Sequence, residues 1–172
     1  MRVTGALLVG GASRRFGSPK ALAETGGRTL AEIAWERLAW CDERLALGKG
    51  ADSLALPFPV ADDGSDQRAP IAGVVGALRL ARNDVCVVVP VDMPGLTEDA
   101  LRRLAAACRD AAVPQTGPLP GAYRRTALPA LEEALAAGRL RLREALAGLD
   151  VAVVDLPPEV LANVNEPADL PL

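Results

Sequence analysis

The chain has 172 residues, half of them hydrophobic, and its 19 basic and 22 acidic residues leave a net charge of −3. This length and hydrophobicity exclude a disordered chain and predict one domain, residues 1–172, with a sizeable core. The acidic balance and the 3% of aromatic residues argue against a general nucleic-acid binder. No apolar run approaches the ~18 residues that cross a bilayer. We therefore expect no nucleic-acid or membrane partners, and we predict a cytoplasmic monomer.

Two residue types are informative through their scarcity. The sequence contains no histidine, so no mechanism can use an imidazole as base, nucleophile or metal ligand. Its only lysines are Lys20 and Lys49, in a chain that otherwise uses arginine. A retained lysine suits a site that needs a compact point charge in place of a planar fork. The three cysteines have no metal-site spacing, and we expect buried free thiols.

The first half of the chain predicts strands and helices in alternation. A capping box formed by Thr29 and Glu32 begins the first helix, which we expect to run to about Trp40. The other elements expected in this half are strands at Val3–Val9, Arg44–Leu47 and Phe58–Ala61, a polar segment at Asp62–Ala69, and a helix at Ile71–Arg82.

The second half continues the alternation and predicts the fold class. Asp84–Val91 is the strongest strand and is apolar on both faces, as the centre of a parallel sheet should be. After it we expect a helix from the Thr97 cap to about Asp110, strands at Ala111–Pro114 and Pro120–Tyr123, helices at Leu128–Ala137 and Leu140–Leu149, a strand at Val151–Leu156 and a short helix from Pro167. The pattern predicts a three-layer, Rossmann-like α/β fold with a mostly parallel central sheet.

Ligands of such folds bind beyond the carboxyl ends of the strands, which draws attention first to Gly10–Lys20. This loop has neither the Walker A nor the dinucleotide-binding spacing. Its glycines nevertheless expose backbone N–H groups, and Arg14, Arg15 and Lys20 add positive charge, a combination that suits a polyphosphate. The alternative is an ordinary strand-to-helix loop with a solvated basic edge.

Two acidic positions follow later strands. Asp92 comes directly after the central strand, where a carboxylate can hold Mg²⁺ or simply cap the following turn. In the segment Asp62–Gly73, one aspartate could bind a sugar hydroxyl or a base edge, and Gly73 could permit the close approach of a ligand. The alternative for this segment is an acidic turn in solvent.

Several remaining positions allow two interpretations. Asn163 and Asn165 suit polar recognition but are also common turn residues. The pair Arg124–Arg125 is either a second anion site or a solvated helix start. We expect Trp35 and Trp40 to serve packing, and Gly138 to stop a helix.

The order of these pieces resembles a known family. The stretch LLVGGASRRFGSPKAL is similar to the signature LAGGxSxRMGxxKxL of nucleotidyltransferases that act on molybdopterin, and most of all to the molybdenum cofactor guanylyltransferases, the MobA family. The motifs APIAG, PVDMPGL, AYRRTALPAL and NVNEPADL follow in the family's order, so that the resemblance spans almost the whole chain. The departures are Val9 for the usual Ala, Phe16 for Met, Ala69 for Gly, and Gly48 where the family tends to have Asn.

The resemblance implies which residues form the site. Backbone groups of Leu8, Val9 and Gly10 would bind the nucleotide. Lys20 would bind its phosphates, Asp66 would help hold the nucleoside, and Asp92 would bind Mg²⁺ and the phosphates. The implied nucleotide-binding set is completed by Gly11, Ser13, Arg14 and Gly73; the implied catalytic residues are Lys20, Asp92 and Arg15; and the rim of the second substrate would include Arg124, Asn163 and Asn165.

The resemblance also implies the reaction: a Mg²⁺-dependent transfer of GMP from GTP to the terminal phosphate of molybdenum-bound molybdopterin, with release of pyrophosphate. The nucleophile is then an already ionised phosphate oxygen, which needs no general base. The absence of histidine is therefore compatible with this reaction. Proteins that deliver molybdopterin or mature molybdoenzymes are the implied partners. The alternatives are a molybdopterin cytidylyltransferase, a guanylyltransferase of another small molecule, and, from a different class, a non-catalytic module that binds GTP or carries molybdopterin.

Overall fold

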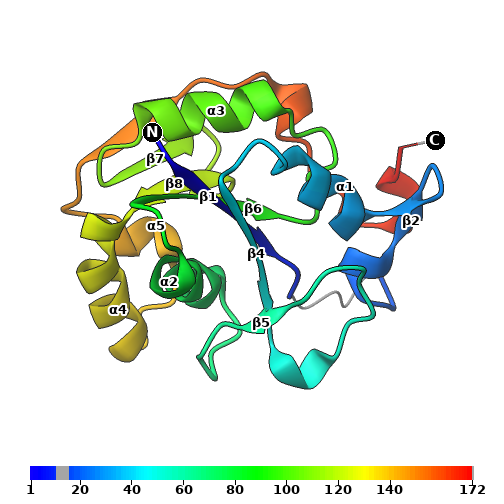
Figure 1. The fold of residues 1–172 in the computed structure, drawn as a ribbon, viewed down its shortest axis with the longest axis horizontal. Coiled ribbons are helices and arrows are strands. Elements are labelled where there is room, and N and C mark those ends of the chain that lie inside the picture. The colour runs from blue at the N-terminus through cyan, green and yellow to red at the C-terminus, as the bar shows by residue number, and fades with distance from the viewer. Residues whose placement is uncertain (11–15, 172) are drawn as a thin grey trace.

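The structure, a computed structural model, describes residues 1–10 and 16–171. In these residues seven strands form one sheet in the order β5-β4-β1-β6-β8-β7-β9 (Figure 1). Their bounds are β1 Val3–Leu8, β4 Glu43–Gly48, β5 Ala61–Asp62, β6 Val85–Pro90, β7 Ala111–Pro114, β8 Gly121–Arg124 and β9 Val151–Val154.

The strands around β1 are parallel. Leu8 at the end of β1 lies beside Leu47 of β4 on one side and Pro90 of β6 on the other. β8 runs antiparallel to β6 and β7, while β9 is parallel to β7. The predicted mostly parallel α/β sheet is therefore confirmed, and the carboxyl ends of β1, β4 and β6 meet at one edge.

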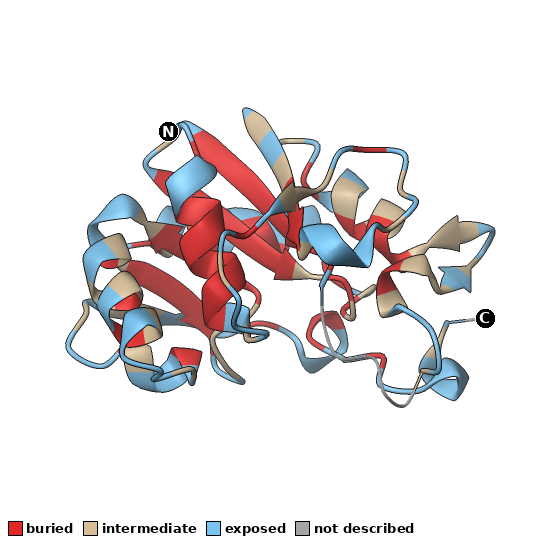
Figure 2. Cartoon of the chain, turned by 90° about the horizontal axis from the view of Figure 1, so that it is seen from below, coloured by how far each residue is buried: buried red, intermediate tan, exposed pale blue. Residues whose placement is uncertain are grey.

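Helices cover both faces of the sheet, because its central strands are apolar on both sides. Val87 and Val89 of β6 belong to the core shared with α1 (Leu30–Arg37) and α3 (Glu98–Ala107). Cys86 and Val88, which point to the opposite face, pack in the core with α2 (Pro70–Leu80), α4 (Leu128–Ala136) and α5 (Leu142–Ala145). Figure 2 shows the central strands and most of α2 as buried. In the described part of the chain no helix is long and apolar enough to cross a membrane.

The capping box predicted for the first helix is present. The Thr29 hydroxyl accepts a hydrogen bond from the Glu32 N–H at 3.1 Å, and the Glu32 carboxylate accepts one from the Thr29 N–H at 2.8 Å. The hydrogen bond from the Thr29 N–H is the main cause that lowers the pKa of Glu32. The helix ends at Arg37 instead of near Trp40, because a turn returns the chain to the sheet, where Asp42 bonds to the backbone of Val3.

The expected strand at Phe58–Ala61 is wrong in place and length. The observed β5 is Ala61–Asp62, and the preceding Pro57 and Pro59 cannot donate to a sheet ladder. Phe58 instead stacks on Trp35 with ring centroids 4.3 Å apart, which confirms a packing role for that tryptophan.

A small hairpin after the first loop was not predicted. β2 (Glu24–Thr25) and β3 (Arg28–Thr29) form a small antiparallel hairpin. Its turn residues Gly26 and Gly27 both have positive φ, and a Gly-Gly pair between two strands is a recognised hairpin signal.

The second half follows the prediction with shorter helices. α3 ends at Ala107, before the expected Asp110, and α5 covers only Leu142–Ala145. Gly138 follows the C-cap residue Ala137 of α4 and has φ of 72°, as a helix stop requires. Of the cysteines, Cys86 and Cys108 are buried free thiols as expected, whereas Cys41 is only partly buried; burial raises the pKa of Cys108 to about 11 and that of Cys41 to about 12.

Candidate functional site

A cleft of about 330 Å³ lies at the sheet edge where β1, β4 and β6 end. It is lined by Leu8, Val9, Gly10, Lys20, Leu47, Gly48, Lys49, Asp63, Arg68, Ala69, Pro70, Gly73, Pro90, Val91, Asp92 and Leu119. The chain leaves β1 toward β4 on one side and returns through α2 to β6 on the other, which makes this edge a topological switch point. Open α/β sheets bind their ligands at such points.

Lys20 and Asp92 form one end of the cleft. Lys20 begins a short 3₁₀ helix, Lys20–Leu22, and Asp92 follows β6 by two residues. The ammonium lies 3.5 Å from the carboxylate, with 20% and 27% of the two side chains exposed. The pair is therefore close enough to interact and open enough for a ligand to reach both charges.

The C-terminal segment supports this end. The N–H of Val164 donates to the backbone oxygen of Asp92 at 2.7 Å, which places Asn163 and Asn165 beside that contact. Asp169 accepts hydrogen bonds from the N–H groups of Asn165 and Glu166. These hydrogen bonds lower the pKa of Asp169, and the charge of Lys20 lowers it further. Asn163 also lines a neighbouring cavity of about 770 Å³ that shares Pro70 and Leu119 with the cleft.

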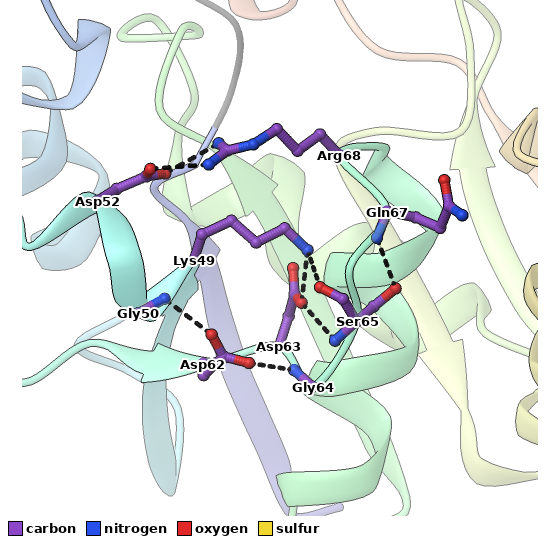
Figure 3. Close-up of polar contacts among 9 residues, drawn as sticks. All are labelled: Lys49, Gly50, Asp52, Asp62, Asp63, Gly64, Ser65, Gln67 and Arg68. Atoms are coloured by element: carbon purple, nitrogen blue, oxygen red, sulfur yellow. Dashed lines mark hydrogen bonds and ion pairs between the residues drawn. The ribbon is translucent and has the colours of Figure 1, made fainter.

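Lys49 and Asp63 form a second charged pair in the cleft wall (Figure 3). Lys49 follows β4, and Asp63 follows β5, the strand that pairs with β4. Their charged atoms are 2.7 Å apart, and only 13% and 8% of the side chains are exposed. Lys49 also donates to the backbone oxygen of Ser65 at 2.6 Å. The sequence predicted that one aspartate of Asp62–Gly73 could bind a ligand, but Asp66 and not Asp63 was assigned to the site. Lys49 was not assigned to the site, and the rarity of lysine was the signal that pointed to it.

Further bonds tie the segments after β4 and β5 together. Arg68 reaches across to Asp52 with two hydrogen bonds of 2.9 and 3.1 Å, as Figure 3 shows. The Gly50 N–H donates to the Asp62 carboxylate at 2.7 Å, and this bond, with a second from Gly64, lowers the pKa of Asp62. Hydrogen bonds therefore already hold the wall that carries Lys49 and Asp63 in place without a ligand.

Two glycines of α2 allow close packing beneath this wall. A Cβ on Gly76 would lie 2.8 Å from the backbone oxygen of Asp63, so the glycine lets that segment rest on the helix. A Cβ on Gly73 would lie 2.7 Å from a methyl group of Leu8. Gly73 lines the cleft, and its close packing against Leu8 gives it a structural role.

The other predicted residues fall into three groups. Leu8, Val9 and Gly10 line the cleft. Asp66 is exposed in the loop before α2, and the aspartate of that loop in the cleft lining is Asp63. Gly11, Ser13, Arg14 and Arg15 lie outside the described residues.

Arg124 lies away from the cleft. It lies beside Val85, at the start of β6, whereas the cleft is at the other end of that strand. There Arg124 faces Asp84 at 3.2 Å, although the Nε–Asp84 geometry does not make a hydrogen bond.

The donor set at Asp92 fits a magnesium ion that is shared with a nucleotide. Among the described residues no three His, Cys, Asp or Glu side chains are placed to hold a metal together. Mg²⁺ in nucleotide sites takes one or two carboxylates and completes its shell with waters and substrate phosphates. A single carboxylate at the open end of the cleft meets that requirement.

Fold and site together define an α/β protein with a ligand cleft at the switch point of its sheet, walled by two Lys–Asp pairs. A family model described as the MobA-like NTP transferase domain matches residues 5–153. The chain therefore belongs to the MobA-like NTP transferase family.

Relatives with assigned names match this sequence over nearly its full length. The chain is 41% identical to a "Probable molybdenum cofactor guanylyltransferase" of Deinococcus radiodurans, over 98% of this chain and 92% of the relative. It is 35% identical to the "Molybdenum cofactor guanylyltransferase" of Cereibacter sphaeroides, over 99% and 94%. The crystal structure of molybdopterin-guanine dinucleotide biosynthesis protein A from Archaeoglobus fulgidus superposes with a TM-score of 0.81 at 26% identity, covering 96% of this chain and 94% of that one.

Proposed function

We propose that the protein transfers GMP from GTP to the terminal phosphate of molybdenum-bound molybdopterin and releases pyrophosphate. The observation that carries the proposal is the Lys20–Asp92 pair at the mouth of the cleft, in a chain 41% identical to a relative named for this activity. The same proposal includes a single catalytic domain over residues 1–172, since the family model already spans most of them.

The chemistry needs charge neutralisation more than proton transfer. An ionised phosphate oxygen of the acceptor attacks the α-phosphorus of GTP, a new P–O bond forms, and the bond to the β-phosphate oxygen breaks. Two anionic groups must therefore be held together in line, which positioned cations favour in a cleft of low dielectric. Lys20 supplies one positive charge that can bind the phosphates at this end of the cleft.

Asp92 would hold Mg²⁺ together with phosphate oxygens of GTP, and the ion would neutralise charge at the reacting phosphates. The backbone of Asp92 is itself fixed by the Val164 N–H, so the carboxylate starts from a supported position. Asn163 would contact the acceptor, and its place in the adjoining cavity that shares Pro70 and Leu119 with the cleft supports this role.

The test is an assay for pyrophosphate with GTP, CTP, ATP or UTP, Mg²⁺ and molybdopterin. We expect release that depends on GTP, on Mg²⁺ and on the acceptor. Preference for CTP would make the protein a cytidylyltransferase, and release with another phosphorylated acceptor only would change the substrate. GTP binding without release in the presence of molybdopterin would leave a binding or carrier module and overturn the proposal.

A further inference from the structure

The Lys49–Asp63 pair is largely removed from solvent, although burying an ion pair contributes little to stability. Removing two charges from water costs free energy that their attraction repays only partly, so a buried ion pair is weak support for a fold. Both side chains line the cleft, and each is held by a further hydrogen bond to or from Ser65. A pair that is costly, rigid and in contact with the cleft suggests a part in recognising the ligand.

The pair retains hydrogen-bonding capacity. Asp63 uses Oδ1 to accept from Lys49 Nζ and from the Ser65 N–H, while the described residues supply no partner for Oδ2. Lys49 donates to Asp63 and to the Ser65 oxygen, which leaves one of its three ammonium hydrogens. Figure 3 shows both atoms on the same side of the segment that joins β5 to α2. The wall thus presents one donor and one acceptor side by side.

We propose that Lys49 and Asp63 read the six-position edge of guanine: Lys49 donates to O6, or to O6 and N7, and Oδ2 of Asp63 accepts from N1–H. Lysine at O6 and N7 is a recurrent way to recognise guanine. Adenine presents an amino donor and an unprotonated ring nitrogen at these two positions, so the ammonium would face a donor and the carboxylate a lone pair. The inference rests on the proposed guanylyl transfer and names the residues that select its nucleotide.

The position of the pair agrees with this role. Lys20 and Asp92 form the phosphate end of the same cleft. The two pairs lie on either side of the end of β1, because Lys49 and Asp63 follow β4 and β5, Asp92 follows β6, and β1 lies between β4 and β6 in the sheet. The hydrogen bonds from Gly50 to Asp62 and from Arg68 to Asp52 hold the segments that carry Lys49 and Asp63. Preformed polar groups discriminate strongly, because a wrong base leaves them buried and unpaired.

The first test uses the wild-type protein and four nucleotides, with Mg²⁺ present and dissociation constants measured by calorimetry. GTP and inosine triphosphate share O6, N7 and N1–H and should bind within about fivefold of each other, because the 2-amino group is not the selected feature. ATP and diaminopurine riboside triphosphate should each bind at least ~10-fold more weakly. Tight binding of the diaminopurine nucleotide with weak binding of inosine triphosphate would overturn the proposal, because the 2-amino group would then be the feature that is read.

The second test uses Lys49→Gln and Asp63→Asn, with Arg79→Gln as the control. Arg79 on α2 forms an exposed ion pair with Glu132 on α4, so the control also removes one positive charge and one ion pair. In each cleft variant the ratio of GTP to ATP affinity should fall at least ~10-fold, whereas in the control it should not change. Unchanged ratios in folded cleft variants would overturn the proposal. If a variant folds poorly, the binding of the four nucleotides to the wild-type protein still tests the proposal.

The outcomes separate this inference from the proposed function. A wild type that transfers GMP but does not discriminate at the six-position edge keeps the function and loses the inference. A wild type that prefers CTP loses both.

Discussion

The two Lys–Asp pairs of the cleft differ in how they are built. Lys20 and Asp92 come from segments far apart in the sequence, are separated by 3.5 Å and are a fifth to a quarter exposed. Lys49 and Asp63 lie 2.7 Å apart, are almost buried and are bound to neighbouring backbone. The first pair leaves room for phosphates and a metal ion, whereas the second is already assembled. This difference supports the two proposals: the open pair suits the binding of charged phosphates, and the preformed pair suits the recognition of a base by hydrogen bonds.

The largest effect on stability should come from breaking the preformed pair. Lys49→Met leaves the Asp63 carboxylate buried without its cation, which typically costs ~3–5 kcal/mol of unfolding free energy. Arg79→Met, which breaks an exposed pair, should cost no more than ~1 kcal/mol. Urea unfolding of the two variants checks this, and equal losses would show that the two kinds of pair do not differ energetically.

At the open end the large effect should be on catalysis. Lys20→Ala and Asp92→Ala should each lower turnover at least ~100-fold, since losing one contact to developing charge typically costs ~2–4 kcal/mol of barrier. Their melting temperatures should stay near that of the wild type, because a partly exposed pair contributes little. Steady-state rates at saturating GTP and acceptor measure this, and wild-type turnover in either variant would contradict the assigned roles.

A smaller change can disturb the preformed end without touching its charges. Gly76→Ala places a methyl group 2.8 Å from the backbone oxygen of Asp63. Overpacking of this kind lowers the free energy of unfolding by ~1–3 kcal/mol. The better helix propensity of Ala raises it by up to ~1 kcal/mol. We expect a net loss of stability and a reduced preference for GTP over ATP.

The matched variant is Gly73→Ala on the same helix. Its methyl group meets the side-chain end of Leu8, which can rotate, whereas the group at Gly76 meets backbone, which cannot. The preference for GTP should therefore fall less in Gly73→Ala, and the reverse order would show that Gly76 does not position Asp63.

The smallest effect concerns pH and the segment behind the open end. Hydrogen bonds from the Asn165 and Glu166 N–H groups lower the pKa of Asp169 from its ordinary value of about 3.9. The stabilisation from this carboxylate is fully present above the unfolded-state pKa and is lost as pH falls through the lowered folded-state pKa. The stability difference between wild type and Asp169→Asn should therefore be constant at neutral pH and shrink in acid. The urea midpoints of the two proteins at pH 7, 5 and 3 test this. A difference between wild type and variant that grows in acid would contradict it.

Local patterns predicted most of the fold. The two-faced apolar run before Asp92, the Thr29 capping box and the glycine stop after α4 each depend on neighbours within a few residues, and all three are present. The same reasoning misplaced β5, because two nearby prolines outweighed the apolar character of Phe58–Ala61.

By itself the sequence determined an α/β sheet, the edge at which its ligand cleft lies, and Lys20 and Asp92 as the charges at that edge. Only the tertiary structure decided that Asp63 and not Asp66 lines the cleft, that Lys49 pairs with it, and that Arg124 lies at the other end of the sheet. The physical reason is range. Helix and strand signals are carried by local spacing, whereas the pairing of two side chains depends on strand register and on helix packing against the sheet, which no local pattern encodes.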